Sequence, residues 1–491
     1  MTLVLAVSIL TGAIGCDTSG EEIPTGTPEP AEPTEIPRVP KGSAPPNVLI
    51  IITDDQRTDS MEALPLTSKW FKDQGRWYPN AFATTPVCCP SRASIFSGRY
   101  AHNHDVRGFT PYKLDQRRTL QASLTRRGYN TAFFGKYLNA WDLRDAPPYF
   151  DKWAFFPQSN VETYAGGTWN VNGTVTQVNE YSTDFMRTHA YRFLDNEGAG
   201  DKPWLMFLST PAPHNPYVPE REYRNADIGS WDGNEAVFEE DLSDKPPHVR
   251  SPFKGICDLD CGRLTREMQH RTLISVDDLI DDVMTRLTKS GDADNTLAFF
   301  VSDNGLMWGE HRLGYKRFPY TQSVLIPFGM RWPGKVEGGI DRRLVANMDI
   351  APTVLDAAGF PKRARKHRDG RSLLSKKWTR DEMLLENWPS QTVPAYAALR
   401  SLDRLYVEYY KDDLQTITFR EFYDLDADPW ELENLLADGD GSTGPGRAAL
   451  ERLHERLQKL RSCRGTGSAG PQDKGGTGSA GPQDKGGTGC P

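Results

Sequence analysis

The fold of this chain is decided by residues 47–55, which read NVLIIITDD. The five successive apolar residues 48–52 suit a β-strand that is buried on both faces of a sheet covered by helices. Asp54 and Asp55 follow directly where this strand ends. Because open α/β sheets bind ligands at the carboxyl ends of their strands, these aspartates are candidates for a functional site.

Three further apolar runs, each followed by polar residues, occur along the chain. Between them lie helical patterns such as residues 280–287, which are apolar at i, i+3, i+4 and i+7. This alternation predicts an α/β domain with a large mixed, mostly parallel sheet flanked by helices. Polar loops follow strands in many proteins, but four such endings with acidic or basic groups favour one shared active site. The three runs and their polar endings are 131–134 with Lys136, 204–208 with His214, and 297–301 with Asp303 and Asn304.

The chain is predicted to consist of five segments. Residues 1–16 form a signal peptide, and residues 17–46, rich in Pro, Glu, Thr and Gly, form a disordered tether. Residues 47–395 form the catalytic domain. Short strand-like runs and a final helix predict a small antiparallel α+β subdomain over residues 396–463. Residues 464–491 contain the unit GTGSAGPQDKG twice and predict an unstructured tail.

The amino terminus predicts export. The apolar run 3–15 is too short to span a bilayer and suits a signal peptide. It ends in AIGC, which resembles a bacterial lipobox and would make Cys16 the lipidated first residue. A basic n-region is missing, so an ordinary secretory signal is the alternative. We expect an extracellular or periplasmic protein that contacts the membrane only through a lipid anchor at Cys16.

Charge and cysteine content narrow the class further. The formal charge of −8 argues against a protein that coats nucleic acid, although it does not forbid a small cationic pocket. In an oxidising compartment, Cys257 is expected to pair with Cys261, which leaves Cys463 to pair with Cys490 around the repeat. A zinc site is the rival interpretation of Cys257 and Cys261, but no second pair of ligands lies nearby in the sequence.

The most specific motif is CCPSRASIFSGR at residues 88–99. Pro90 suits the first turn of a helix and Gly98 suits its end, so Cys88 is expected just before a helix N-terminus. Unpaired backbone N–H groups there favour an anion, and Arg92 adds a cation within the first turns. The position alone predicts a nucleophile, and a plain reactive cysteine would also fit it.

This motif resembles the signature of the type I sulfatases, which belong to the alkaline phosphatase superfamily. The resemblance extends over about residues 47 to 435, and its details are more like the N-acetylglucosamine-6-sulfatase branch. It implies that a formylglycine-generating enzyme converts Cys88 to formylglycine, whose hydrated aldehyde is the nucleophile. It also implies that Cys89 has no catalytic part, because the motif counts from the first cysteine.

The resemblance further implies a metal site made of oxygen ligands. Asp54 and Asp55 are similar to the family's first metal-binding pair, and Asp303 with Asn304 to its second. The oxygen derived from Cys88 completes the shell. Hard oxygen ligands select Ca²⁺ or Mg²⁺. One Ca²⁺ ion is expected, and Mg²⁺ is the less favoured choice.

Three more motifs supply the expected cations. Lys136 in GKYLN, His214 in PHNP and Lys316 downstream of DNG match family motifs. By analogy, Lys136 and Arg92 steady the formylglycine hydrate, while His214 and Lys316 bind the leaving oxygen and one of them is the general acid. The chain departs from the family at Leu138, where many members have a histidine.

The predicted function is therefore hydrolysis of sulfate esters, with a sulfated sugar or an aryl sulfate as substrate. A 6-O-sulfated N-acetylglucosamine is the favoured sugar, and the loops 147–178 and 219–261 are expected to select it. Tyr423, Glu431 and Asn434 fall in a C-terminal family signature with an expected packing role. One rival is a phosphonate monoester or phosphodiester hydrolase of the same superfamily. The other is a lipoprotein that binds sulfated glycans without turnover.

Overall fold

The apolar run identified above forms β1 (Asn47–Thr53), a fully buried strand in the middle of the main sheet. Val48, Ile50 and Ile52 point into one hydrophobic core, and Leu49 and Ile51 point into another on the opposite face. The structure, a computed structural model, describes residues 45–158, 161–198, 200–437, 444–465 and 490.

The main sheet has ten strands. Its centre, in the order β9-β1-β8-β4-β5, is parallel, whereas β10, β6 and β7 pair in antiparallel fashion, so the predicted mixed, mostly parallel sheet is confirmed. In spatial order the strands are β11 (Gly339–Ile340), β2 (Arg76–Trp77), β10 (Phe328–Arg331), β9 (Thr296–Ser302), β1, β8 (Trp204–Ser209), β4 (Asn130–Lys136), β5 (Lys152–Phe156), β6 (Gly167–Val171) and β7 (Thr174–Val178).

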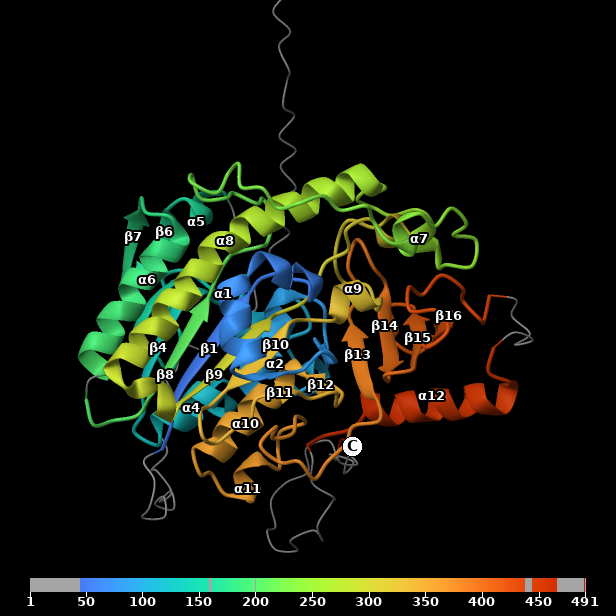
Figure 1. Ribbon diagram of the computed structural model, residues 1–491. Coiled ribbons are helices and arrows are strands. Elements are labelled where there is room, and N and C mark those ends of the chain that lie inside the picture. Colours follow the sequence, from blue (N-terminus) through green and yellow to red (C-terminus); the bar gives the residue numbers. More distant parts are fainter. Residues whose placement is uncertain (1–44, 159–160, 199, 438–443, 466–489, 491) are drawn as a thin grey trace, which may run out of the picture. The chain divides into compact units, whose positions relative to one another are not determined.

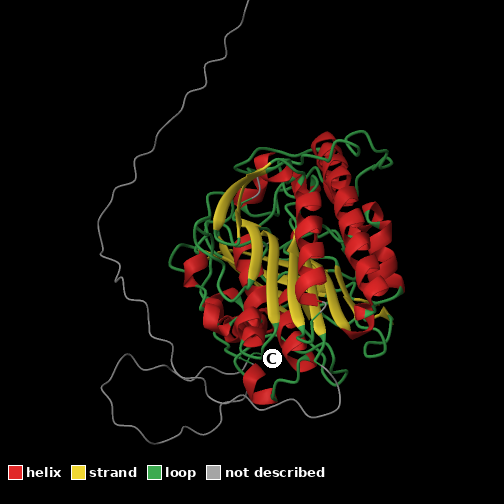
Figure 2. Ribbon diagram, turned by 90° about the vertical axis from the view of Figure 1, so that its left-hand side faces the viewer, coloured by secondary structure: helices red, strands yellow, loops and turns green. Residues whose placement is uncertain are grey.

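Helices cover both faces of this sheet (Figures 1 and 2). The long helix α8 (Leu259–Ser290) and α6 (Ser182–Phe193) pack on one core, where the predicted stripe at residues 280–287 is buried. The other core is covered by α2 (Cys88–Ser97), α4 (Leu120–Thr125) and α10 (Ile350–Ala357). The shorter helices are α1 (Pro65–Ser68), α3 (Ala101–His104), α5 (Val161–Tyr164), α7 (Pro247–Arg250), α9 (Thr321–Val324) and α11 (Lys362–Arg365).

A smaller four-stranded antiparallel sheet lies toward the carboxyl terminus, with α12 (Arg447–Arg461) beside it (Figure 1). Its first strand precedes residue 396, the boundary expected from the change in sequence texture. The strands are β13 (Met383–Asn387), β14 (Ala395–Arg400), β15 (Arg404–Tyr410) and β16 (Ile417–Asp424). A separate two-stranded pair joins β3 (Ala81–Phe82) to β12 (Val345–Ala346).

The expectation that residues 147–178 form a loop is wrong. This segment supplies β5, β6 and β7, three strands at one end of the main sheet. The last strand is largely exposed, so its polar sequence TVTQV looks like a loop, and only pairing with β6 orders its backbone. Edge strands of this kind lack the apolar alternation that reveals a half-buried strand.

Both predicted disulfides are present, Cys257–Cys261 and Cys463–Cys490. The first excludes a zinc site at these two cysteines. The predicted signal peptide, the lipobox at Cys16 and the repeat after Gly465 lie outside the described residues. Within the described part of the chain, none of the helices combines the length and apolar character needed to cross a membrane.

Candidate active site

Polar groups from four parallel strands meet at one edge of the main sheet. Asp54 and Asp55 follow β1, Lys136 ends β4, and Asp303 follows β9, while the loop after β8 carries His214. Because these strands are parallel neighbours, their carboxyl ends share one edge. The structure therefore brings together the acidic and basic residues that the sequence pointed to.

Cys88 is the first residue of α2, whose N-cap is Val87 and whose C-cap is Gly98 in the left-handed conformation. The Cys88 thiol is buried and donates a hydrogen bond to Asp54 Oδ1 at 3.3 Å. Lys316 Nζ lies 2.8 Å from the same sulfur. Burial and the Asp54 charge raise the pKa of the Cys88 thiol, and the nearby lysines offset this only in part. This environment does not favour a thiolate nucleophile.

Each buried carboxylate faces a cation. Lys136 Nζ contacts Asp54, and Lys316 Nζ contacts Asp55. Arg92 Nε donates to Asp303 Oδ2 at 2.8 Å. Burial opposes ionisation of Asp54, but Lys136 and other neighbouring cations hold its pKa well below the usual range. Three buried carboxylates and three buried cations therefore balance one another at this site.

Asp303 also shapes the loop after β1. Its Oδ1 accepts a hydrogen bond from the backbone N–H of Asp55 at 3.1 Å, and Asp55 has a positive φ of 67°. Such a conformation is uncommon for a residue other than glycine and is stabilised here by this contact. Burial and the Asp54 charge raise the pKa of Asp303 to about 6.

The residues fit a divalent cation of the hard type. Ligand atoms of Asp54, Asp55, Cys88 and His214 all lie within 4.8 Å of one another. Asn304 Nδ2 donates to Asp55 Oδ1 at 2.7 Å, whereas the buried Asn304 Oδ1 has no hydrogen-bond partner among the described residues. An amide oxygen without a hydrogen-bond partner, beside converging carboxylates, is a suitable ligand for Ca²⁺ or Mg²⁺. A bound cation would compete with the lysines for the same carboxylate oxygens.

His214 lies on the outer side of this cluster. Its Nδ1 is 2.5 Å from the carbonyl oxygen of Asn215, and its Nε2 is 3.7 Å from Asp55 Oδ2. The hydroxyl of Tyr164 donates to the His214 carbonyl at 2.5 Å and holds the loop in place. Burial lowers the pKa of His214 despite the neighbouring aspartates. The contact with the Asn215 carbonyl places a proton on Nδ1, because a carbonyl can only accept.

Gln269 on α8 is a residue that the sequence analysis missed. It is fully buried, and its Nε2 donates to the carbonyl oxygens of Asp55 at 3.1 Å and Pro213 at 3.0 Å. Trp308 Nε1 donates to Gln269 Oε1 at 2.7 Å. The signal was a polar residue on the apolar stripe of α8, four residues before Leu273. One amide thus joins the loop after β1 to the loop that carries His214.

Leu138 and Cys89 stay outside the polar cluster. Leu138 is fully buried in the core beneath α2, and its side chain does not enter the site. The Cys89 thiol points to the carbonyl oxygen of Asn139 at 3.7 Å. Of the two adjacent cysteines, only Cys88 contacts the charged residues.

The comparisons with known proteins agree with this geometry. Residues 46–360 match the Sulfatase family, and residues 309–462 match the C-terminal region of N-sulphoglucosamine sulphohydrolase. The chain belongs to the sulfatase family. This sulfatase is 30% identical over 492 residues to the N-acetylglucosamine-6-sulfatase of Capra hircus, with 88% of this chain and 86% of that protein covered.

Solved structures show the same fold. One was determined in complex with its substrate D-glucosamine-2-N,6-O-disulfate and has a TM-score of 0.72 at 22% identity, covering 85% of this chain and 97% of the other. The phosphonate monoester hydrolase of Agrobacterium radiobacter has a TM-score of 0.67 at 22% identity, with 85% and 95% covered. The predicted fold is thereby confirmed, and membership of the sulfatase family makes this chain a sulfuric ester hydrolase.

Proposed function

We propose that this sulfatase hydrolyses sulfate esters of glycans through a formylglycine made from Cys88 and one Ca²⁺ ion. Asp54, Asp55, Asp303 and Asn304 would hold the ion together with an oxygen derived from Cys88. The observation that carries this proposal is the placement of Cys88 at the first turn of α2, with a carboxyl of Asp54 and the ammonium of Lys316 both at its sulfur.

When present, formylglycine supplies a hydrated aldehyde as nucleophile, and the metal supplies positive charge at the sulfate oxygens. The chain's own residues orient the reaction. Arg92 and Lys136, both fully buried, present fixed cations beside the first turn of α2. The unpaired backbone N–H groups of that first turn add to the electrostatic field of the two cations and favour a bound sulfate.

Lys316 and His214 flank Asp55 and are proposed to act on the leaving oxygen. Lys316 Nζ carries the proton that the leaving group needs, because its ammonium form is held by Asp55. His214 carries a proton on Nδ1, toward the Asn215 carbonyl, so its Nε2 would accept a hydrogen bond from the leaving group once Lys316 has protonated the leaving oxygen. Lys316 is thus the proposed general acid.

A 6-O-sulfated N-acetylglucosamine is the substrate that we propose. The relative from Capra hircus is named for this activity and covers most of the chain at 30% identity. We further propose that the protein is exported, that a formylglycine-generating enzyme matures it, and that Cys16 anchors it to a membrane through lipid. The alternative substrate class is phosphonate monoesters or phosphodiesters, because a phosphonate monoester hydrolase has the same fold.

The mass of the peptide that contains Cys88 tests the proposal most directly. Conversion to formylglycine lowers that mass by about 18 Da, whereas ordinary oxidation of cysteine raises it. The protein should be produced together with a formylglycine-generating enzyme. An unconverted Cys88 in an active enzyme would refute the proposed nucleophile, and an inactive, unconverted protein that still binds sulfated glycans would indicate a binding protein.

Paired assays separate the substrate classes. We expect the converted protein to hydrolyse 4-nitrophenyl sulfate and 6-O-sulfated N-acetylglucosamine. Bis(4-nitrophenyl) phosphate is the matched phosphodiester substrate. Faster hydrolysis of the phosphodiester than of both sulfate esters would indicate that the protein is a phosphodiesterase.

A further inference from the structure

Two arginines near the active site each lie over an aromatic ring. Arg317 directly follows Lys316, and its Cζ is 5.8 Å from the ring centroid of Phe109. Arg107 Cζ is 5.4 Å from the ring centroid of Trp388. Arg107 and Phe109 belong to one short loop, so the two pairs are neighbours. We refer to these four residues, Phe109, Arg317, Arg107 and Trp388, as the arginine–aromatic strip.

The strip lies beside the segment that leads into Cys88. Lys316, next to Arg317, reaches the sulfur of Cys88. The residue after Phe109, Thr110, meets the Cys89 thiol through its backbone. The segment that carries Trp388 is joined to the same region, because the N–H of Glu386 donates to the carbonyl oxygen of Thr84 at 2.9 Å. Each of the three chain segments that carry the strip thus contacts residues 84–89, the stretch that ends in Cys88 and Cys89.

The outer end of the strip opens into a cavity of about 170 Å³. Trp388 and Arg107 line it together with His102, Glu386 and Arg461. This volume is below the roughly 300–1,000 Å³ of typical drug-sized sites, so the cavity suits one sugar unit rather than a long segment.

The strip and its cavity carry an excess of positive charge. Glu386 is paired with His102, at 2.9 Å from its Nδ1, and Asp105 lies 3.2 Å from the Nε of Arg107. Within the described part of the chain, neither Arg317 nor Arg461 has a carboxylate within 4 Å. The Phe109 side chain is 52% exposed and leaves one large apolar surface beside these cations.

We propose that the strip binds the sugar unit next to the one that carries the scissile sulfate. A sulfate or carboxylate group of that sugar unit pairs with Arg317 and Arg107. The sugar ring itself packs on the exposed part of Phe109. A planar guanidinium suits both anions because it donates two parallel hydrogen bonds. Contact with an aromatic ring holds each guanidinium in place before binding. The inference rests on the proposed glycan sulfatase activity.

The test compares a small substrate with a longer one in the converted, full-length enzyme. Phe109→Ala and Arg107→Ala should each lower kcat/KM about tenfold for a heparan-sulfate-derived tetrasaccharide with a terminal 6-O-sulfated N-acetylglucosamine. Hydrolysis of 4-nitrophenyl sulfate should stay within about twofold, because that substrate does not reach the strip. An equal loss on both substrates, or no loss on the tetrasaccharide, would overturn the inference.

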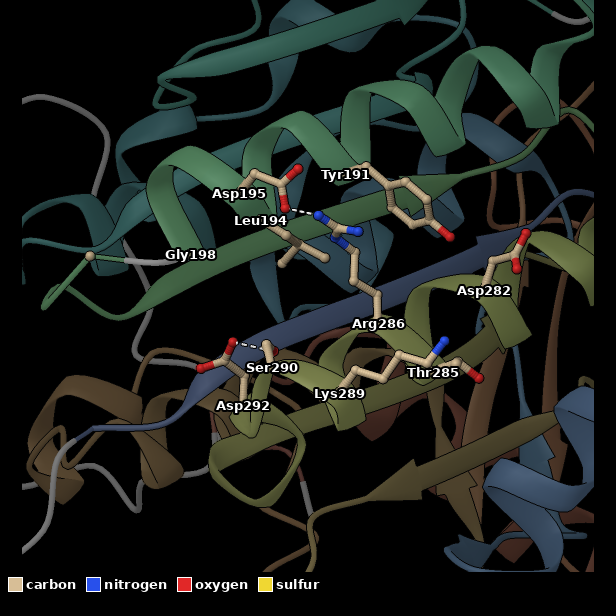
Figure 3. A pocket seen from close by; sticks show the side chains of 11 residues that line it. Tyr191, Leu194, Asp195, Gly198, Asp282, Thr285, Arg286, Lys289, Ser290 and Asp292 are labelled. Atoms are coloured by element: carbon tan, nitrogen blue, oxygen red, sulfur yellow. Dashed lines mark hydrogen bonds and ion pairs between the residues drawn. The ribbon is translucent and has the colours of Figure 1, made fainter.

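A matched control lies near the amino ends of the strands, away from the edge that carries the active site. Arg286 also lies over an aromatic ring, with its Cζ 4.6 Å from the centroid of Tyr191, and it is paired with Asp195 (Figure 3). It lines a cavity of about 650 Å³ between α6 and α8, near the amino ends of β8 and β9. Arg286→Ala should leave both activities unchanged. A loss on the tetrasaccharide equal to that of Arg107→Ala would mean that any surface arginine attracts the polyanion.

Binding separates failure of this inference from failure of the proposed function. In a Cys88→Ala background, Phe109→Ala and Arg107→Ala should weaken tetrasaccharide binding about tenfold, even if the wild type hydrolyses no glycan. Unchanged binding would refute the strip whatever the activity is. Carboxyl-reduced and N-desulfated tetrasaccharides identify the anion, because removal of the correct group abolishes the effect of Arg107→Ala. If Arg107→Ala weakened binding of both modified tetrasaccharides as strongly as binding of the unmodified one, the proposed pairing of an anionic group with the arginines would be refuted.

Discussion

Two of the regions that bury carboxylates compensate these charges in different ways. At the edge of the ten-stranded sheet, Asp54, Asp55 and Asp303 meet ammonium and guanidinium groups. Full charges of both signs lie close together, and the buried Asn304 Oδ1 is left without a hydrogen-bond partner in the described structure. This region holds charge that an incoming ion or substrate can redistribute.

In the four-stranded sheet, Glu421 is surrounded by neutral donors instead. The hydroxyls of Tyr320, Tyr409 and Tyr423 donate to its two oxygens at 2.7–2.8 Å. Burial raises the pKa of Glu421, and the three hydrogen bonds offset part of that effect. Every polar group in this cluster has a partner, so nothing is left over for a ligand.

The charged cluster and the hydrogen-bonded cluster, both buried, are thus suited to different roles. A satisfied hydrogen-bonded network stabilises one packing arrangement. Opposed full charges cost desolvation, and they are useful where a reaction develops charge, because the surrounding dipoles need not reorganise. We therefore expect substitutions in the first region to change activity and those in the second to change stability.

The largest expected effect is the loss of activity in Cys88→Ala. Removing a nucleophile lowers kcat by at least about 10³-fold. Cys89→Ala should retain most activity, because that thiol faces the Asn139 carbonyl outside the charged cluster. Steady-state kinetics on 4-nitrophenyl sulfate measures both. Retained activity in Cys88→Ala together with lost activity in Cys89→Ala would refute the assignment of Cys88 as the nucleophile.

Glu421→Leu should mainly destabilise the protein. It leaves three buried hydroxyls without an acceptor, at a cost of about 1–3 kcal/mol each, so the free energy of unfolding should fall by ~3 kcal/mol or more. Glu421→Gln, which keeps an acceptor oxygen, should cost less. Urea unfolding measures the stability, and the activity per folded molecule should remain normal. A specific loss of activity in both variants would remove the distinction between the two regions.

Calcium should stabilise the first region and leave the second unaffected. At a concentration about 100 times its Kd, Ca²⁺ would add ~2.7 kcal/mol to the free energy of unfolding, because it binds only the folded state. Asp54→Asn and Asn304→Ala should reduce the calcium-dependent rise in Tm, and Glu421→Gln should not. Thermal unfolding with EDTA or Ca²⁺ measures this. An undiminished rise in Asp54→Asn would place the ion elsewhere.

The smallest effect concerns the link that Gln269 makes between the loop after β1 and the loop that carries His214. Gln269→Met removes the donors to Asp55 and Pro213 at nearly constant volume, and groups that support metal ligands are worth about tenfold or more in activity. We expect kcat to fall about tenfold together with calcium affinity. Ser275→Ala, on the same helix and also buried, is the control. A loss of stability in Gln269→Met with unchanged kcat and calcium affinity would make Gln269 a packing residue.

The sequence by itself determined the elements whose signals are local. The apolar run at residues 47–55, the helix that starts at Cys88 and stops at Gly98, and the stripe on α8 were all visible, because burial on both faces and helix ends leave patterns within one segment. The two disulfide pairs could be predicted from the number of unassigned cysteines and the oxidising compartment expected for an exported protein. The site residues could be named from motifs, since each follows its own strand or helix.

Only the tertiary structure decided how those residues are paired and what surrounds them. The contacts of Arg92 with Asp303, of Gln269 with Asp55, and of Arg317 with Phe109 join segments far apart in sequence. The edge strand β7 is ordered by its neighbour rather than by its own composition. Such features arise from the register of the sheet and the packing of loops, and these depend on distances that no local pattern encodes.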